Sequence, residues 1–228
     1  MNLLAFDTAT TGCSAAVFRD GRLAVRRGAA MSRGQSEALM PMIEDTLRDA
    51  GITYDDLAAL AVTVGPGAFT GLRIGLAAAR GLALALAIPC AAVTTLEAVA
   101  RAVPEAALRD RPLLVALDSK REDLYVQMFA AGLAPLCAPA AMLAGDLHAL
   151  CRVGAPLVAG DAGDRALEAL RGAGIAAAVA DVPGVPDAVQ VGEIALSRDL
   201  PPRGNEPAPI YLRPPDAVRP KDGGRLRP

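Results

Sequence analysis

The sequence predicts an α/β fold made of two similar lobes, and three observations lead to this prediction. Segments typical of strands and of helices alternate through most of the 228 residues. The strand–turn–strand pattern at the start of the chain returns in its second half. Apolar residues make up 53% of the sequence, which is enough to fill two cores even though much of that share is alanine.

The first half opens with a strand at 3–6, a turn, and a second strand at 13–18. The Asp20–Gly21 pair predicts a tight hairpin that leads to a third strand at 23–27. A helix at 35–49 follows, ended by Gly51. The remaining expected elements of this half are a strand at 60–64, a helix at 71–87, a strand at 90–93 and a short helix at 96–103.

The second half begins like the first. Residues 3–21 match residues 113–132 without a gap, and each segment is a buried strand that ends in an acid and a hydroxyl residue. The matched pairs are Leu3 with Leu114, Ala5 with Ala116, Asp7 with Asp118, Thr8 with Ser119, Phe18 with Phe129 and Gly21 with Gly132. Two unrelated hairpins with similar hydrophobic patterns are the alternative. We interpret the match as an internal duplication, with one lobe at 1–103 and the other at 104–186.

This repeated unit, followed in each half by αβα segments, resembles the actin, sugar-kinase and heat-shock ATPase superfamily, which has a duplicated, ribonuclease H-like fold. The resemblance implies two lobes that face each other across a nucleotide cleft, with Asp7, Thr8, Asp118 and Ser119 on its walls. It also implies that a helix near 187–199 returns to pack on the first lobe.

Catalysis by this chain alone is not expected. The first turn, DTATTG, has fewer glycines than a phosphate-binding turn needs, and the only lysines are Lys120 and Lys221. We therefore predict no catalytic residue, and interpret Asp7 and Asp118 as remnants of a degenerate nucleotide cleft that now cap turns and hold strands.

Composition argues against several other classes of protein. There is one histidine, His148, and the four cysteines have no CxxC spacing, so we expect no metal site and no disulfide framework. The cysteines are Cys13, Cys90, Cys137 and Cys151. The first residues, MNLLAFD, lack a basic signal-peptide region, and Arg80 interrupts the longest apolar stretch. We expect a cytoplasmic protein without a membrane span.

The composition changes after Leu200. Eight of the 18 prolines lie in 201–228, together with six basic and three acidic side chains. The segment PIYLR at 209–213 could form an ordered strand, and we expect the residues after it to be flexible.

A glycine-rich stretch, VGPGAFTGLRIG, occupies 64–75 between a strand and a helix. Loops of this kind can bind phosphate at the helix N-terminus. However, the Walker lysine is absent, and the dinucleotide pattern GxGxxG, counted from Gly65, has Thr70 in place of its third glycine. We therefore interpret the stretch as a structural loop, formed by Gly65, Pro66, Gly67 and Gly71.

The helix after this loop is apolar around its whole circumference, which predicts that two of its sides are covered. The helix at 35–49 adds a second apolar stripe that contains methionines, which are frequent at adaptable interfaces. An internal helix pair is the alternative interpretation. We predict a partner-binding surface made of Ser36, Leu39, Met40, Ile43, Leu47, Thr70, Leu72, Arg73, Leu76 and Arg80.

Four motifs in order make the resemblance specific. They are FDTAT at 6–10, VGPGAFTGLRIG at 64–75, DSKREDLY at 118–125 and PIYLR at 209–213. Together they resemble the TsaB (YeaZ) family over residues 1 to about 213. The chain departs from the family pattern at Ala68, where serine is usual, at Gln35, where many relatives have histidine, and at 119–121, where Ala-Arg-Arg is usual.

The resemblance implies a non-catalytic subunit of the machinery that forms N6-threonylcarbamoyladenosine beside the anticodon of tRNAs reading codons that start with A. It implies a heterodimer with the paralogue TsaD, which holds the metal and performs the transfer, and TsaE as an ATPase partner. We expect the chain alone to form a homodimer, to reach tRNA only through the complex and to bind no cofactor, with ATP, ADP and metal possible only in the complex. The glycine loop would then start a helix that closely approaches another subunit. An independent ATPase or small-molecule kinase of the same fold is the alternative.

Overall fold

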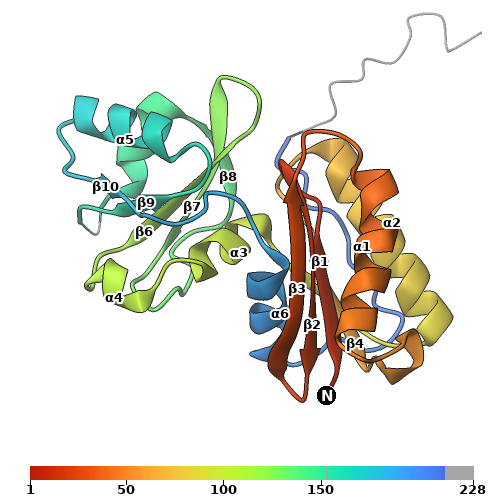
Figure 1. Cartoon of the computed structure of the whole chain (residues 1–228). Coiled ribbons are helices and arrows are strands. Elements are labelled where there is room, and N and C mark those ends of the chain that lie inside the picture. Colours follow the sequence, from red (N-terminus) through yellow and green to blue (C-terminus); the bar gives the residue numbers. More distant parts are fainter. Residues whose placement is uncertain (153, 214–228) are drawn as a thin grey trace, which may run out of the picture.

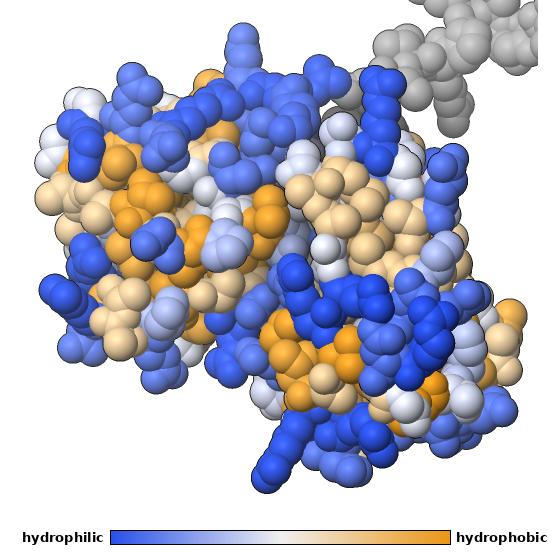
Figure 2. Space-filling model, viewed as in Figure 1, coloured by the Kyte–Doolittle hydropathy of each residue, from blue (hydrophilic) through white to orange (hydrophobic). Residues whose placement is uncertain are grey.

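A computed structural model describes residues 1–152 and 154–213. The predicted flexibility of the last residues, 214–228, falls outside this range. Two five-stranded sheets, each covered by helices, form two lobes that lie side by side (Figure 1). In the space-filling view the lobes are joined by a narrower middle, and hydrophilic side chains surround areas of exposed apolar residues (Figure 2).

The N-terminal lobe contains a mixed sheet in the order β3-β2-β1-β4-β5. Its strands are β1 (Leu3–Asp7), β2 (Gly12–Arg19), β3 (Arg22–Ala30), β4 (Ala59–Thr63) and β5 (Cys90–Val93). Its helices are α1 (Gln35–Asp49), the 3₁₀ turn η1 (Tyr54–Asp56), α2 (Phe69–Leu86) and α3 (Thr95–Arg101). Strand β1 is buried along its whole length because it is the central strand and has helices on both faces.

The C-terminal lobe contains the second sheet, in the order β10-β9-β6-β7-β8. Its strands are β6 (Leu113–Asp118), β7 (Asp123–Phe129), β8 (Ala140–Leu143), β9 (Leu157–Ala159) and β10 (Ala178–Val179). Its helices are α4 (Glu105–Leu108), the 3₁₀ segment η2 (Ala144–Leu150) and α5 (Gly163–Gly172).

The two sheets have the same topology. Read from the other end, the second sheet runs β8-β7-β6-β9-β10 and matches the first strand for strand. In each sheet the first three strands are antiparallel neighbours and the fourth and fifth are added in parallel. The strands that contain Asp7 and Asp118 occupy the same central place. The duplicated α/β fold predicted from the sequence is therefore confirmed.

Helices cover both faces of the first sheet. One core, which includes Leu4 and Phe6, lies between the sheet and the pair α1–α2. A second core, which includes Leu3 and Ala5, lies under α6 (Ala188–Leu196). Helix α6 therefore packs on the N-terminal lobe although the chain reaches it from the C-terminal lobe (Figure 1). Helix α3 contacts both α6 and β6 and lies between the lobes.

Among the described residues, α2 is the one helix that is long and apolar enough to cross a membrane. Here it packs on β4 and α1, with Leu72 and Leu76 in the core. The C-terminal segment contacts α2 at one side, where the Arg80 guanidinium donates to the carbonyl of Pro207 at 2.7 and 3.0 Å.

The segment around Ile210 is ordered but is not a strand, so that prediction is wrong. Its one backbone link to the first sheet is the hydrogen bond from the Ile210 N–H to the carbonyl of Val64, at 2.7 Å. Pro207 and Pro209 have no N–H to donate, which prevents the segment from extending this pairing into a ladder.

Candidate functional site

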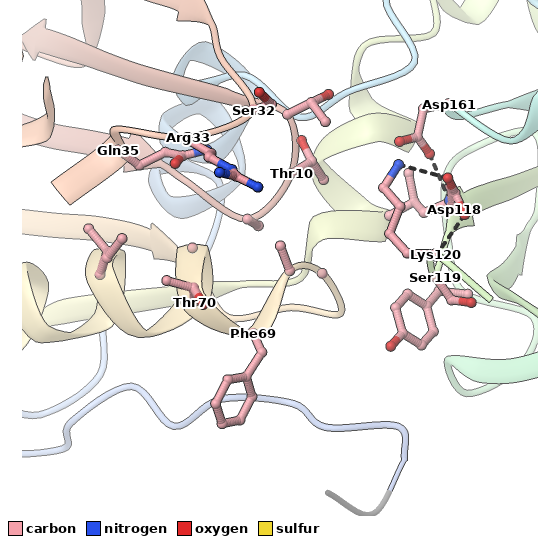
Figure 3. A pocket seen from close by; sticks show the side chains of 18 of the residues that line it. Thr10, Ser32, Arg33, Gln35, Phe69, Thr70, Asp118, Ser119, Lys120 and Asp161 are labelled. Carbon is pink, nitrogen blue, oxygen red and sulfur yellow. Dashed lines mark hydrogen bonds and ion pairs between the residues drawn. The ribbon is translucent and has the colours of Figure 1, made fainter. Parts of the chain in front are cut away.

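A cleft of about 500 Å³ lies between the lobes. The β1–β2 turn, the start of α1 and the start of α2 form one wall, and the ends of β6 and β9 form the other. Figure 3 shows the two walls facing each other across open space. The polar side chains on the walls include Thr10, Ser32, Arg33, Gln35 and Thr70 on the N-terminal side and Asp118, Ser119, Lys120 and Asp161 on the other.

Asp118 is the last residue of β6, and the turn that follows it holds its side chain in place. Its carboxylate accepts hydrogen bonds from the backbone N–H and the ammonium of Lys120, both at 2.7 Å. Its backbone N–H donates to the Asp161 carboxylate at 2.8 Å. Desolvation raises the pKa of Asp118, but the two hydrogen bonds from Lys120 outweigh it, so the net shift is downward. Asp118 is therefore an ionised group that already has a cationic partner.

Ser119 lies beside Asp118 on the same wall, and its hydroxyl is also engaged. It donates within the β6–β7 turn to the carboxylate of Asp123 at 2.6 Å, with the Asp123 carbonyl oxygen at 2.7 Å. Both predicted residues of this wall thus line the cleft, but their polar atoms already have partners within their own lobe.

Asp7 does not line the cleft, and the predicted facing pair is wrong for this residue. Its side chain is 1% exposed and accepts hydrogen bonds from the Thr63 hydroxyl at 2.5 Å and from the Ala9 N–H at 3.1 Å. Burial is the largest cause of its shift and raises the pKa to about 7, with hydrogen bonds from Thr63 and Ala9 opposing it. Thr8 is equally buried. These two residues hold the turn together from inside.

The glycine loop explains why this turn is closed. A Cβ atom at Gly71 would lie 2.0 Å from the carbonyl oxygen of Thr8, and one at Gly67 would lie 2.2 Å from that of Ala9. The Thr8 hydroxyl donates to the Gly71 carbonyl at 2.7 Å, and the Ala68 N–H donates to that of Ala9 at 2.7 Å. The glycines therefore let α2 approach the β1–β2 turn of its own lobe. The predicted reason, close approach to another subunit, is not needed for them.

The first glycine of the loop, Gly65, also allows a close approach within the chain itself. Gly65 has φ of +105°, which favours glycine, and a Cβ atom there would lie 2.8 Å from the carbonyl oxygen of Ile210. Pro66 is buried beside it. The loop is a three-way junction between β4, the β1–β2 turn and the C-terminal segment.

Half of the predicted partner-binding surface is not on the surface. Its five branched aliphatic members are at most 3% exposed: Leu39, Ile43, Leu47, Leu72 and Leu76. All of them except Leu72 belong to the core between α1, α2 and the sheet. The internal-pair interpretation is the correct one for them. Met40 and Arg80 are partly exposed, and Ser36, Thr70 and Arg73 are exposed.

Helix α2 presents a different set of residues to solvent, of which Thr70 and Arg73 were predicted and Leu84 was not. Its outward residues follow one another at intervals of three or four and form what we call the α2 stripe: Thr70, Arg73, Ala77, Gly81 and Leu84. Leu84 is 81% exposed, the highest value among the exposed large apolar side chains of the described chain. The stripe could have been found by separating the leucines of α2 according to helical angle.

No group of three or more histidine, cysteine, aspartate or glutamate side chains is arranged to hold a metal within residues 1–152 and 154–213. The four cysteines are free thiols, with Cys13 and Cys90 buried. Asp118 and Asp161 are the two carboxylates of the cleft.

Comparisons with known proteins agree with this geometry. The chain is 37% identical over 125 residues to the Escherichia coli K12 tRNA threonylcarbamoyladenosine biosynthesis protein TsaB, which covers 55% of this chain and 53% of that protein. The structure of YeaZ from Pseudomonas aeruginosa superposes with a TM-score of 0.76 and 27% identity, covering 92% of this chain and 99% of that one. The chain belongs to the TsaB (YeaZ) family.

A longer alignment is found with a protein that has no assigned function. An uncharacterized protein of Mycobacterium tuberculosis H37Rv is 36% identical over 159 residues, 68% of this chain and 72% of that protein. The chain aligns with about half the length of the E. coli TsaB. The TsaD family, described as tRNA N6-adenosine threonylcarbamoyltransferase, matches residues 29–136. The duplicated fold is of the actin-like ATPase and sugar-kinase class, as the sequence predicted.

Proposed function

We propose that this chain supports the formation of N6-threonylcarbamoyladenosine beside the anticodon of tRNA as a non-catalytic subunit that binds a TsaD paralogue. The observation that carries the proposal is the likeness to TsaB proteins, whose E. coli member is named for threonylcarbamoyladenosine biosynthesis. Because the aligned part is about half of that protein, the activity and the partners are both part of the proposal.

The match to the TsaD family supports a pairing between paralogues. It covers 29–136, which contains α1 and α2 together with β4 and β5. Two chains with the same helix pair can bury one surface against its counterpart around an approximate two-fold axis. The same geometry allows a homodimer when TsaD is absent, and TsaE and tRNA would join through the complex in the cytoplasm.

The α2 stripe is the surface that we assign to this contact. Ala77 and Gly81 leave its centre flat, and nothing lies within 4 Å of a Cβ atom placed at Gly81, so a second helix can approach closely. Leu84 offers an apolar side chain whose burial is worth about 1.5–3 kcal/mol. Arg73 within the stripe and Arg80 beside it add positive charge.

A non-catalytic role is supported by the state of the two acids. The Asp7 carboxyl is enclosed by the glycine loop, and the Asp118 carboxylate is paired with Lys120. In a catalytic nucleotide cleft the corresponding groups would hold metal and water. We therefore propose that ATP, ADP and metal bind only in the complex.

One observation favours an independent ATPase or small-molecule kinase as the second candidate. The cleft is large enough for a small ligand and has the carboxylates of Asp118 and Asp161 on one wall. Calorimetric titration of the chain with ATP and magnesium, with and without TsaD, separates the two functions. Our proposal predicts heat of binding only in the presence of TsaD.

The decisive test replaces the TsaB of E. coli with this chain in a depletion strain and measures N6-threonylcarbamoyladenosine in tRNA by nucleoside mass spectrometry. We expect the wild type and Asp118→Asn to restore the nucleoside and Leu84→Glu to fail. Leu143→Glu is the matched control, because Leu143 is an exposed leucine (52%) on the other lobe. A chain that never restores the nucleoside, or that loses it with Asp118→Asn, would contradict the proposal.

A further inference from the structure

A second cavity, of about 610 Å³, adjoins the cleft at the start of α2. Three parts of the chain form it: the loop that precedes α2, the β6–β7 turn and the C-terminal segment that ends at Arg213. We call it the tail pocket. It joins the two lobes, since the Arg213 guanidinium forms an ion pair with Asp123 of β7 while Ile210 is hydrogen-bonded to Val64.

Aromatic side chains gather at the tail pocket. The chain has only seven, and three of them, Phe69, Tyr125 and Tyr211, line this cavity. Phe69 is 48% exposed and Tyr211 45%, and they are the two aromatic residues among the exposed large apolar side chains. Their ring centroids are 5.5 Å apart at an interplanar angle of 34°. Figure 3 shows Phe69 turned away from Asp118, toward the C-terminal segment.

Positive charge surrounds these rings. Arg73 lies over Phe69, with its guanidinium carbon 3.7 Å from the ring centroid, and its Nε donates to the Tyr211 hydroxyl at 3.4 Å. Lys120, Arg121 and Arg213 complete the cationic lining, and no acidic residue of the described chain lines the pocket. The ion pairs of Lys120 with Asp118 and of Arg213 with Asp123 hold two of these cations in place.

Rings and cations together define the chemistry of the ligand. An aromatic shelf alone would suit an apolar side chain, and a basic pocket alone would suit any anion. A flat aromatic group joined to a phosphate satisfies both, because bases stack on exposed rings while cations hold the backbone. An acidic or phosphorylated peptide would leave the pair of rings without a matching surface.

We propose that the tail pocket binds one nucleotide of single-stranded RNA, with its base stacked on the Phe69–Tyr211 pair and its phosphate next to Lys120 and Arg73. The choice of RNA over a free nucleotide rests on the proposed function, in which the chain belongs to a complex that modifies a tRNA. The sequence after the pocket, 214–228, carries four basic and two acidic side chains, which adds attraction for a polyanion.

The test measures binding of the full-length chain, without TsaD, to a fluorescent single-stranded RNA of anticodon-loop length by anisotropy. Tyr211→Ala is expected to weaken binding about fivefold or more, the range for the loss of one stacked base, while Tyr211→Phe keeps the affinity. Lys120→Gln is expected to weaken binding to all RNA sequences and to lower the slope of log K against log salt by about one. Arg22→Gln, an exposed arginine on the β2–β3 hairpin, is the control and should change little.

A second experiment uses only the wild type, so its result does not depend on whether Tyr211→Ala folds. Ultraviolet crosslinking of 4-thiouridine RNA to the wild type, with peptide mapping, should place the crosslink on peptides that contain Phe69 or Tyr211. Tighter binding of free AMP or ATP than of RNA would assign the pocket to a mononucleotide and overturn the claim that its ligand is RNA. Equal competition by polyphosphate or by a phosphopeptide would overturn the claim that a base stacks on the Phe69–Tyr211 pair. Unchanged affinity in both Tyr211→Ala and Lys120→Gln overturns the proposal.

The outcomes separate this inference from the proposed function. Leu84→Glu should lose TsaD but keep RNA binding by the isolated chain, because Leu84 does not line the tail pocket. If TsaD binds normally and RNA binding does not depend on Tyr211, only the RNA inference fails. If RNA binds through Tyr211 and TsaD does not bind, only the proposed function fails.

Discussion

The two lobes carry equivalent acids on equivalent strands, but the acids have opposite environments. Asp7 ends β1, is 1% exposed and has its pKa raised to about 7 by burial. Asp118 ends β6, has a side chain that is 33% exposed, and its pKa is lowered through Lys120 despite partial burial. A shared topology therefore does not preserve the chemistry of a site, because the residues packed on the turn decide it.

The difference comes from the helix that follows the fourth strand of each sheet. In the N-terminal lobe, Gly67 and Gly71 let α2 lie directly on the β1–β2 turn. In the C-terminal lobe, Gly160 makes a similar close approach, with a Cβ atom 2.0 Å from the Ala116 carbonyl, but Asp161 follows and points a carboxylate at the turn. Both turns line the cleft, but the acid of the first is buried behind its turn and the acid of the second lies on the cleft wall.

The first prediction breaks the close packing of the first turn. Gly71→Ala would place a methyl group 2.0 Å from the Thr8 carbonyl, so α2 must shift. We expect the free energy of unfolding to fall by about 2–3 kcal/mol, as in overpacked cores. Gly81→Ala is the control on the same helix, with no atom within 4 Å, and should gain about 0.5–1 kcal/mol from helix propensity. Urea denaturation of both variants measures the contrast, and equal stabilities would show that the glycine contact is not tight.

A second prediction concerns the pH dependence that Asp7 imposes. Its pKa rises from 3.8 to about 7 on folding, so the unfolded state ionises first as the pH increases. The free energy of unfolding should therefore decrease between about pH 4 and pH 7, by up to about 4 kcal/mol, and level off above pH 7. Asp7→Asn keeps an acceptor for Thr63 and Ala9, so it should remove this decrease and be more stable than wild type at pH 8. A wild-type stability that rises from pH 4 to pH 7 through Asp7 would contradict the buried geometry.

Asp118→Asn should change the free energy of unfolding least. It should lower stability at neutral pH, whereas Asp7→Asn should raise it. Because the pKa of Asp118 is lowered, the stability that it contributes is present above about pH 4 and is lost as the pH falls through the folded pKa. The pair with Lys120 is partly exposed, so the loss should stay below about 1 kcal/mol at neutral pH. Thermal denaturation at pH 3 and pH 7 measures it, and a large loss at pH 7 would mean that the second turn is as structural as the first.

Sequence reasoning located the strands, the duplication and the two acids, because these depend on local hydrophobic periodicity and on a gapless match. It did not establish that Asp7 faces inward, because that depends on Thr63 and on glycines more than fifty residues away. It also placed Leu72 and Leu76 on the surface, although the same helix buries them and exposes Leu84. When a helix has apolar residues on every face, its sequence does not indicate which face packs on the sheet.

The C-terminal segment shows a second limit. Tyr211 and Arg213 belong to a motif noticed in the sequence, but their contacts with Phe69 and Asp123 connect segments far apart in the chain. Composition predicted flexibility only after residue 213, and it does not report the few specific contacts that hold the segment before it.

The central claim is that the N-terminal lobe binds a TsaD paralogue through the α2 stripe, and one titration tests it most directly. Wild type, Leu84→Glu and Leu143→Glu are titrated into TsaD in a calorimeter after circular dichroism has shown that all three are folded. We predict that Leu143→Glu binds like wild type and that Leu84→Glu binds at least about a hundredfold more weakly, since a buried unpaired carboxylate costs several kcal/mol. Equal binding by all three proteins would contradict the claim and place the contact elsewhere.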